Sequence, residues 1–278
     1  MNKNILKTYV LLAALGGALV LVGRQFFGPN GPLIGLGLGL LLVGGSYWFS
    51  DKLAVKASRA RPVTESEAPH LYRIVRELTT RANMAMPRLY VIPSEQPNAF
   101  ATGRNERHAA VAVTEGITKL LTEEELRGVL AHELGHVGNR DILIGSVAAA
   151  IATGITYIAH FGIFFGGSDD DEGGGLSGLL LLFLAPLAAG LLQMALSRSR
   201  EFEADRTGAH IIGSGEPLAR ALEKMEVAAK QIPMKVNPAQ AQAYIVNPLT
   251  GRKANFARMF SSHPPTGERI ERLRRWRG

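Results

Sequence analysis

The 278-residue sequence contains no cysteine. Disulfide bonds, thiolate-ligated zinc and catalytic thiols are therefore excluded. Any metal ion must be bound by histidine, aspartate or glutamate side chains. The absence leaves the redox compartment open, because a chain without thiols is compatible with either environment.

Charged residues are missing from four long stretches, 8–23, 25–50, 142–168 and 173–197. They contain 16, 26, 27 and 25 residues. About 20 apolar residues cross the hydrocarbon core of a bilayer, and the first stretch gains length if Lys7 and Arg24 snorkel to the headgroups. We therefore predict about four transmembrane helices arranged as two hairpins.

Two alternatives apply to these stretches. The first could be a secretory signal, because the basic segment MNKNILK precedes it. No small-x-small cleavage site follows before Arg24, and a second apolar stretch comes at once, which favours a retained anchor. The third and fourth stretches could be buried helices of a soluble core, although charge-free runs of this length are more typical of lipid.

The basic residues indicate the orientation of the hairpins. Arg24 alone lies between the first two stretches, and the acidic segment 166–175 between the last two contains no Lys or Arg. The positive-inside rule then places the remaining basic segments in the cytoplasm. The predicted organisation is a membrane hairpin (1–50), a first cytoplasmic catalytic part (51–141), a second hairpin (142–197) and a second catalytic part (198–278). The net charge of +7 is thereby explained without a nucleic-acid partner.

The segment 51–141 has the pattern of an α+β fold. Apolar residues repeat first at helical spacing and then in short β-rich runs that turn residues separate. The helical repeat comprises Leu71, Ile74, Val75 and Leu78, and the strand candidates are Leu89–Ile92, Phe100–Gly103 and Ala109–Thr114. We therefore predict an α+β domain with a small sheet.

A further helix is clearly marked after these strands. Thr122 and Glu125 have the spacing of a capping box. The apolar face that follows comprises Leu126, Val129, Leu130, Leu134 and Val137. This helix carries His132, Glu133 and His136. Residues four apart share a helix face, so both imidazoles can occupy corners of a zinc tetrahedron, with Glu133 as general base. The alternative is a surface helix with two incidental histidines.

A third ligand must come from elsewhere in the chain. Glu201 and Asp205 are also four apart, so one helix presents both carboxylates on the same side. Glu201 could ligate zinc while Asp205 accepts the free ring N–H of a liganding histidine. Glu203 should point away and be solvated. The alternative for Glu201 and Asp205 is a set of exposed ion pairs with neighbouring arginines (Arg198, Arg200 and Arg206).

These motifs together resemble the HtpX membrane proteases, relatives of the eukaryotic CAAX prenyl endopeptidase. The resemblance rests on three segments: His132-Glu-Leu-Gly-His136 followed by Asn139 and Asp141, Ser197-Arg198 leading into Glu201-Phe-Glu-Ala-Asp205, and His263-Pro-Pro. It covers nearly the whole chain. It implies a gluzincin-like α+β domain at the cytoplasmic side of the inner membrane, with one Zn²⁺ per chain and Glu201 as its third ligand. It also implies quality control of misfolded or damaged membrane proteins.

The same resemblance gives roles to other residues. Asn98, Ala99 and Phe100 would bind an extended substrate at a strand edge, unless they form an ordinary hairpin strand with Asn98 in a turn. His263 would donate a hydrogen bond to the oxyanion, or would cap the helix that follows it. Asn139, like Asp205, would support the zinc ligands from behind.

Two other functions fit the sequence less well than a protease. A membrane scaffold or holdase with a structural metal would be expected to have four closed protein ligands, and Glu133 would have no task. A metal transporter would have ionisable residues within its apolar stretches, which contain only His160. Zinc endopeptidase activity is therefore predicted, on membrane-protein or unfolded polypeptide substrates at a lipid bilayer. Prenyl proteins are less favoured, because few spans cannot build a large membrane chamber.

Overall fold

The computed structural model describes residues 20, 28–31, 33–34, 37, 41, 44–45, 48–141, 198–231, 245 and 264–278. The chain divides into two compact units, Met1–Tyr47 with Leu143–Leu196, and Trp48–Ile142 with Ser197–Gly278. The first is described only at scattered positions, including the short helix η1 (Gly28–Asn30). The architecture below is that of the second unit.

The predicted membrane helices fall largely outside the described residues. Stretches 142–168 and 173–197 lie wholly outside them, and 8–23 and 25–50 mostly so. Among the residues that are described, no helix combines the length and the apolar character needed to cross a membrane. The two hairpins therefore stay a prediction.

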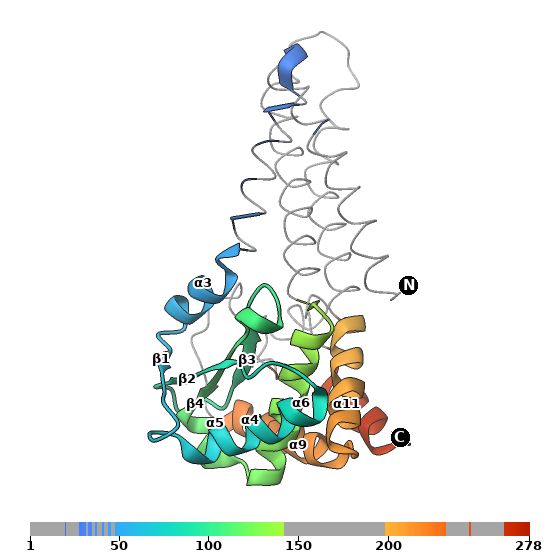
Figure 1. The fold of residues 1–278 in the computed structure, drawn as a ribbon. Helices are drawn as coiled ribbons and strands as arrows, with labels where there is room; N and C mark the ends of the chain where they lie inside the picture. The colour runs from blue at the N-terminus through green and yellow to red at the C-terminus, as the bar shows by residue number, and fades with distance from the viewer. Residues whose placement is uncertain are drawn as a thin grey trace. The chain divides into compact units, whose positions relative to one another are not determined.

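A small mixed sheet forms one part of the second unit (Figure 1). Its strands are β1 (Arg61–Pro62), β2 (Arg88–Ile92), β3 (Ala99–Thr102) and β4 (Ala110–Thr114), in the order β1-β2-β4-β3. β2 and β4 are parallel, and the other two pairs are antiparallel. Three of these strands confirm sequence predictions to within a residue or two, whereas the two-residue β1 was not predicted.

Helices account for the rest of the unit. They are α3 (Ser50–Ala57), α4 (Pro69–Ala82), η2 (Glu106–His108), α5 (Glu115–Leu120), α6 (Glu123–Gly138), α9 (Glu216–Gln231) and α11 (Thr266–Arg274). Residues 198–212 are helical as well. α4 begins with proline in its first turn and ends at Asn83, which has the left-handed conformation of a C-cap at φ 52°. The predicted α+β class is confirmed.

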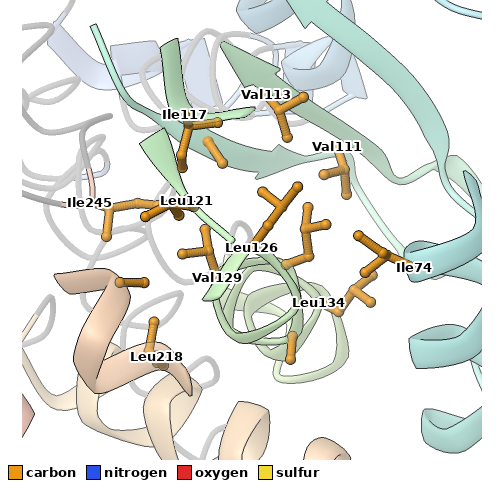
Figure 2. Close-up of a cluster of buried hydrophobic side chains, with 14 of the residues drawn as sticks. Ile74, Val111, Val113, Ile117, Leu121, Leu126, Val129, Leu134, Leu218 and Ile245 are labelled. Carbon is orange, nitrogen blue, oxygen red and sulfur yellow. The ribbon is translucent and has the colours of Figure 1, made fainter. Parts of the chain in front are cut away.

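The hydrophobic core lies between the sheet and the helices. Figure 2 shows Val111 and Val113 of β4 facing Val129 and Leu134 of α6, with Ile74 of α4 beside them. All five are almost completely buried, as the helical and alternating patterns in the sequence require. α6 contacts β3, α4 and α9, so it is the central helix of the unit. Polar residues in the middle of α6, His132 and Glu133 among them, are therefore buried.

Candidate metal centre

The start of α6 is fixed by a complete capping box. Thr122 accepts a hydrogen bond from the backbone N–H of Glu125, and the Glu125 carboxylate accepts one from the backbone N–H of Thr122. The Glu125 carboxylate also accepts a hydrogen bond of 2.8 Å from Lys224 of α9. With its start defined in this way, α6 presents His132 and His136 one turn apart on one face.

Two glycines let the helical segment 198–212 approach α6 closely. A Cβ atom on Gly208 would lie 2.9 Å from the backbone nitrogen of His132, and one on Gly135 would lie 3.0 Å from the backbone oxygen of Ala204. Contacts this short leave no room for a side chain. The close approach brings Glu201 and Asp205 to the histidine face of α6.

The two histidines and Glu201 converge on one point. The Nε2 atoms of His132 and His136 are 3.2 Å apart, and the Glu201 carboxylate lies 3.6 Å from the first and 3.5 Å from the second. Two tetrahedral ligands at about 2.05 Å from zinc are separated by roughly 3.3 Å. The two nitrogens therefore have the spacing of two corners of a zinc site, and the Glu201 carboxylate lies near enough to supply a third ligand.

The far nitrogen of each imidazole is bound by a carboxylate. His132 Nδ1 lies 2.9 Å from Asp205 Oδ1, and His136 Nδ1 lies 2.7 Å from Asp141 Oδ2. A carboxylate accepts the Nδ1 proton, which leaves the lone pair on Nε2. Two such lone pairs 3.2 Å apart repel each other unless a cation lies between them. The donor set therefore fits a zinc ion at His132, His136 and Glu201.

The site carries an excess of negative charge. Burial alone would lower the pKa of His136, but the hydrogen bond to Asp141 and the charge of Glu201 outweigh it and raise that pKa well above its ordinary value. A site that stabilises positive charge on an imidazole this strongly also favours a metal cation in the same place.

Glu133 lies beside the metal-binding group and touches the sheet. It is buried, and its Oε2 accepts a hydrogen bond of 2.8 Å from the backbone N–H of Ala101 in β3. Burial raises the pKa of Glu133 above its ordinary value, while the hydrogen bond from Ala101 and the neighbouring histidines pull it back down. A buried carboxylate with a raised pKa is suited to accept a proton and to hold it before releasing it.

β3 is the outer strand of the sheet next to Glu133. Within the described part of the chain, β4 alone pairs with it. Thr114 N–H donates to Asn98 O over 2.9 Å, which fixes the alternation of the antiparallel ladder. The backbone groups of Phe100 consequently face β4, whereas those of Ala99 and Ala101 face away from β4. The buried Asn98 side chain accepts a hydrogen bond from the Ile245 N–H over 3.2 Å.

Arg269 completes the group from α11, and the sequence did not single it out. Its side chain is only 1% exposed, donates two hydrogen bonds of 2.9 and 2.7 Å to Asp205, and lies 3.2 Å from Glu201. One of its nitrogens lies 3.4 Å from both ring nitrogens of His132, so it packs against the ring instead of bonding a single lone pair. The charge of Arg269 outweighs the effect of burial and lowers the pKa of Asp205.

Three other residues considered for the site from the sequence are Asn139, Glu203 and His263. Asn139 is the C-cap of α6 and donates to Thr207 Oγ1 over 3.3 Å, which links α6 to the segment 198–212. Glu203 lies outside the metal-binding group and pairs with Arg206. His263 falls outside the described residues, so its predicted role stays a prediction.

Asp141 was named from the sequence only as part of the motif, without a role, and Arg269 was not named. Asp141 follows His136 by five residues, and this short spacing at a helix end was a signal that could have been used. Arg269 stands among many arginines in the last segment of the chain, and nothing local distinguishes the buried one. Its carboxylate partners Asp205 and Glu201 lie more than sixty residues away along the chain.

Comparisons with known proteins agree with this geometry. The sequence pattern of peptidase family M48 matches residues 65–277. The chain is similar to "Protease HtpX homolog" of Pelotomaculum thermopropionicum, with 54% identity over 97% of this chain and 98% of the relative. The protein of the same name from Syntrophobacter fumaroxidans is 52% identical over 96% and 98%.

One solved structure has the same fold. The crystal structure of S. mikatae Ste24p superposes on 97% of this chain with a TM-score of 0.59 and 20% sequence identity. This chain spans 65% of the length of the Ste24p chain. At this identity the likeness concerns the fold alone.

Proposed function

Because this chain belongs to peptidase family M48 and is a metalloprotease of the HtpX type, we propose that it is a membrane-bound zinc endopeptidase of quality control. Its substrates would be misfolded or damaged membrane proteins and other unfolded polypeptides. The single observation that carries the zinc chemistry is the convergence of two Nε2 lone pairs and the Glu201 carboxylate beside Glu133. The quality-control role rests on the resemblance to the HtpX proteases.

His132 Nε2, His136 Nε2 and Glu201 would hold the zinc ion. When bound there, zinc supplies a polarised water molecule and an electrophile for the scissile carbonyl. Glu133 would accept the proton of that water on its carboxylate and would deliver it to the leaving amine. The raised pKa of Glu133 supports this role, because the carboxylate must hold the proton between the two transfers.

The surrounding residues would orient the ligands. Asp205 and Asp141 hold the imidazole rings through their Nδ1 atoms, which sets the tautomer and directs each Nε2 toward the metal. Arg269 compensates the charges of Asp205 and Glu201, two carboxylates that could not remain ionised together in a dry site without a cation. These residues bind and position, and no proton passes through them.

The outer edge of β3 would bind the substrate. An extended peptide can add to a sheet edge through main-chain hydrogen bonds, which accepts many sequences. Two observations support this role: the backbone groups of Ala99 and Ala101 do not bond β4, and the Ala101 N–H holds this edge against Glu133. Asn98 would hold the start of the strand through Thr114 and Ile245. A peptide bond laid along this edge would pass directly beside the general base.

The membrane location and the role of His263 complete the proposal. The four charge-free stretches and the distribution of basic residues support two membrane hairpins with the catalytic unit in the cytoplasm. Anchoring would raise the effective concentration of membrane substrates at the site. His263 would donate a hydrogen bond to the oxyanion. Its place six residues before Arg269 supports this role, since Arg269 reaches the metal-binding group.

The test compares the detergent-purified protein with three glutamate variants. Hydrolysis of casein and bound zinc per chain are measured for each. Glu133→Gln should keep its zinc and lose about 10²- to 10⁴-fold of the rate, because only proton transfer is removed. Glu201→Gln should lose zinc and activity together. Glu203→Gln is the matched control and should change neither, because Glu203 pairs with Arg206 away from the site.

Two outcomes would contradict the proposal. Activity that survives in Glu133→Gln would remove this carboxylate from the reaction. Zinc bound by the wild type without hydrolysis of casein or of a membrane-protein substrate would instead favour a scaffold with a structural metal.

A further inference from the structure

The start of α3 and the loop after β3 form one exposed surface of aromatic and basic side chains. Trp48 and Phe49 are 56% and 49% exposed, although they are large apolar side chains of a kind that folding usually buries. The Arg104 guanidinium lies over the Trp48 indole at 4.2 Å from the ring centroid, and the Lys52 ammonium lies 5.7 Å from that of Phe49. We call this set the Trp48 surface.

The charge of the Trp48 surface is positive. The basic residues of the first two turns of α3 and of the segment that follows β3 are Lys52, Lys56, Arg104 and Arg107, of which Arg104 is half-buried and the other three are exposed. The exposed acidic residue of the same loop is Glu106. Asp51 does not offset the basic charge, because it is buried and ion-paired with Arg88.

We propose that the Trp48 surface binds the headgroups of anionic phospholipids. Tryptophan is enriched at membrane–water interfaces, where its ring lies at the headgroup level. Lys and Arg beside it are attracted to the negative charge of phosphatidylglycerol-type lipids. A nucleic acid would account for the basic charge but not for the exposed Trp48 and Phe49, which lie at the end of the charge-free stretch 25–50. The inference rests on the membrane-bound part of the proposed function.

This surface is connected to the active centre by a short piece of chain. Arg104 comes two residues after the end of β3, and Ala101 of β3 donates its N–H to Glu133. Three residues of chain span at most about 11 Å. α3 also contacts β3. Headgroups on the Trp48 surface would therefore hold the outer edge of β3 close to the membrane, where polypeptide segments leave the bilayer.

The chain contains just two tryptophans, Trp48 and Trp276 of the C-terminal segment, which makes the test specific. The full chain is reconstituted in vesicles of phosphatidylcholine and phosphatidylglycerol at one fixed composition. Bromine, which quenches tryptophan fluorescence, is placed on the acyl chains of one lipid or of the other. Trp276→Phe leaves Trp48 as the reporter, and Trp48→Phe leaves Trp276 as its control.

Trp48 should be quenched more by brominated phosphatidylglycerol than by brominated phosphatidylcholine. One basic side chain at the surface favours anionic lipid by about fivefold, so the local enrichment should be of this order or larger. Trp276 should show no such difference. In the Trp276→Phe background, Lys52→Gln/Lys56→Gln/Arg107→Gln should abolish the preference. The charge-matched set Lys119→Gln/Arg206→Gln/Arg275→Gln, on other elements, should retain it.

The remaining outcomes separate this inference from the proposed function. A chain that floats with the vesicles but shows equal quenching of Trp48 by both lipids would overturn the lipid surface alone. Protection of Trp48 from both lipids, together with self-association of the chain, would assign the surface to a second copy and also overturn it. A chain that does not float with vesicles would overturn both the surface and the membrane-bound part of the proposed function.

Discussion

The two histidines of the metal-binding group, His132 and His136, are held in place in different ways. His132 is 1% exposed, and its partner Asp205 is clamped by Arg269 from α11. His136 is 17% exposed, and its partner Asp141 lies just beyond the end of the same helix. The first side is dry and braced by distant parts of the chain, while the second is local and more accessible. The environment of His132 therefore constrains the geometry of the site more tightly than that of His136, which is the more exposed of the two.

The largest effect is expected from removing Arg269, which holds Asp205 and, through it, His132. Arg269→Met should lower the free energy of unfolding by about 3–5 kcal/mol, because Asp205 and Glu201 become buried carboxylates without their cation. Zinc binding should fall as well. Denaturant unfolding and zinc content of the detergent-purified protein would measure both effects. Arg275→Met, six residues later, removes an exposed pair with Glu271 and should change little. An Arg269→Met protein that is as stable as the wild type and binds as much zinc would contradict this role of Arg269.

The two carboxylates behind the histidines give a direct test of the comparison. Removing such a partner typically lowers metal affinity by about 10- to 100-fold. Asp205→Asn should lie at the upper end of this range, since it also deprives Arg269 of a partner. Asp141→Asn should lie at the lower end, because its side is less buried. Chelator competition would measure the zinc affinity of both variants. A larger loss in Asp141→Asn than in Asp205→Asn would show that His136 depends more on its carboxylate partner than His132 does.

The close helix contact can be tested by adding a single methyl group. Gly208→Ala would place a Cβ 2.9 Å from the His132 backbone nitrogen, and overpacking of this kind costs about 1–3 kcal/mol. Gly138→Ala at the end of α6 is the control, because the nearest atom belongs to the Met84 side chain at 3.8 Å. The control should be neutral or stabilising by up to about 1 kcal/mol. Thermal unfolding of both variants would measure this difference, and equal stability of the two would contradict a tight contact at Gly208.

The smallest effect concerns the start of α6, far from the braced side. Burial alone would raise the pKa of Glu125, but hydrogen bonds from Lys224 and Thr122 outweigh it and lower that pKa below its ordinary value of 4.5. The contribution of the ionised Glu125 to the free energy of unfolding is therefore present above about pH 4.5 and is lost as the pH falls through the lowered pKa. Lys224→Met should cost about 1 kcal/mol or less at neutral pH.

The pH dependence of stability shows whether Lys224→Met acts by removing the ion pair with Glu125 or only by changing an exposed side chain. The difference in unfolding free energy between Lys224→Met and wild type should shrink in acid, where Glu125 is protonated in both proteins. Lys119→Met, which removes an exposed pair with Glu95, should show no such trend. A difference that grows in acid would mean that Lys224 acts through something other than Glu125.

Much of the second unit was predicted from the sequence because its signals are local. The apolar repeat of α4, the strands β2 and β4 and the capping box of α6 each depend on residues a few positions apart, and each is present in the structure. The strand β1 was missed, since two residues carry no periodicity. The membrane hairpins stay a prediction, because their residues lie outside the described part of the chain.

For the site, the sequence by itself determined the pairs that a single helix aligns. His132 with His136, and Glu201 with Asp205, are four apart, so helical geometry alone puts each pair on one face. Only the tertiary structure decided that these two faces meet, that Ala101 touches Glu133 and that Arg269 is the buried arginine. These contacts join segments far apart in the chain, and their formation depends on close packing at Gly135 and Gly208 and on burial, which no local pattern encodes.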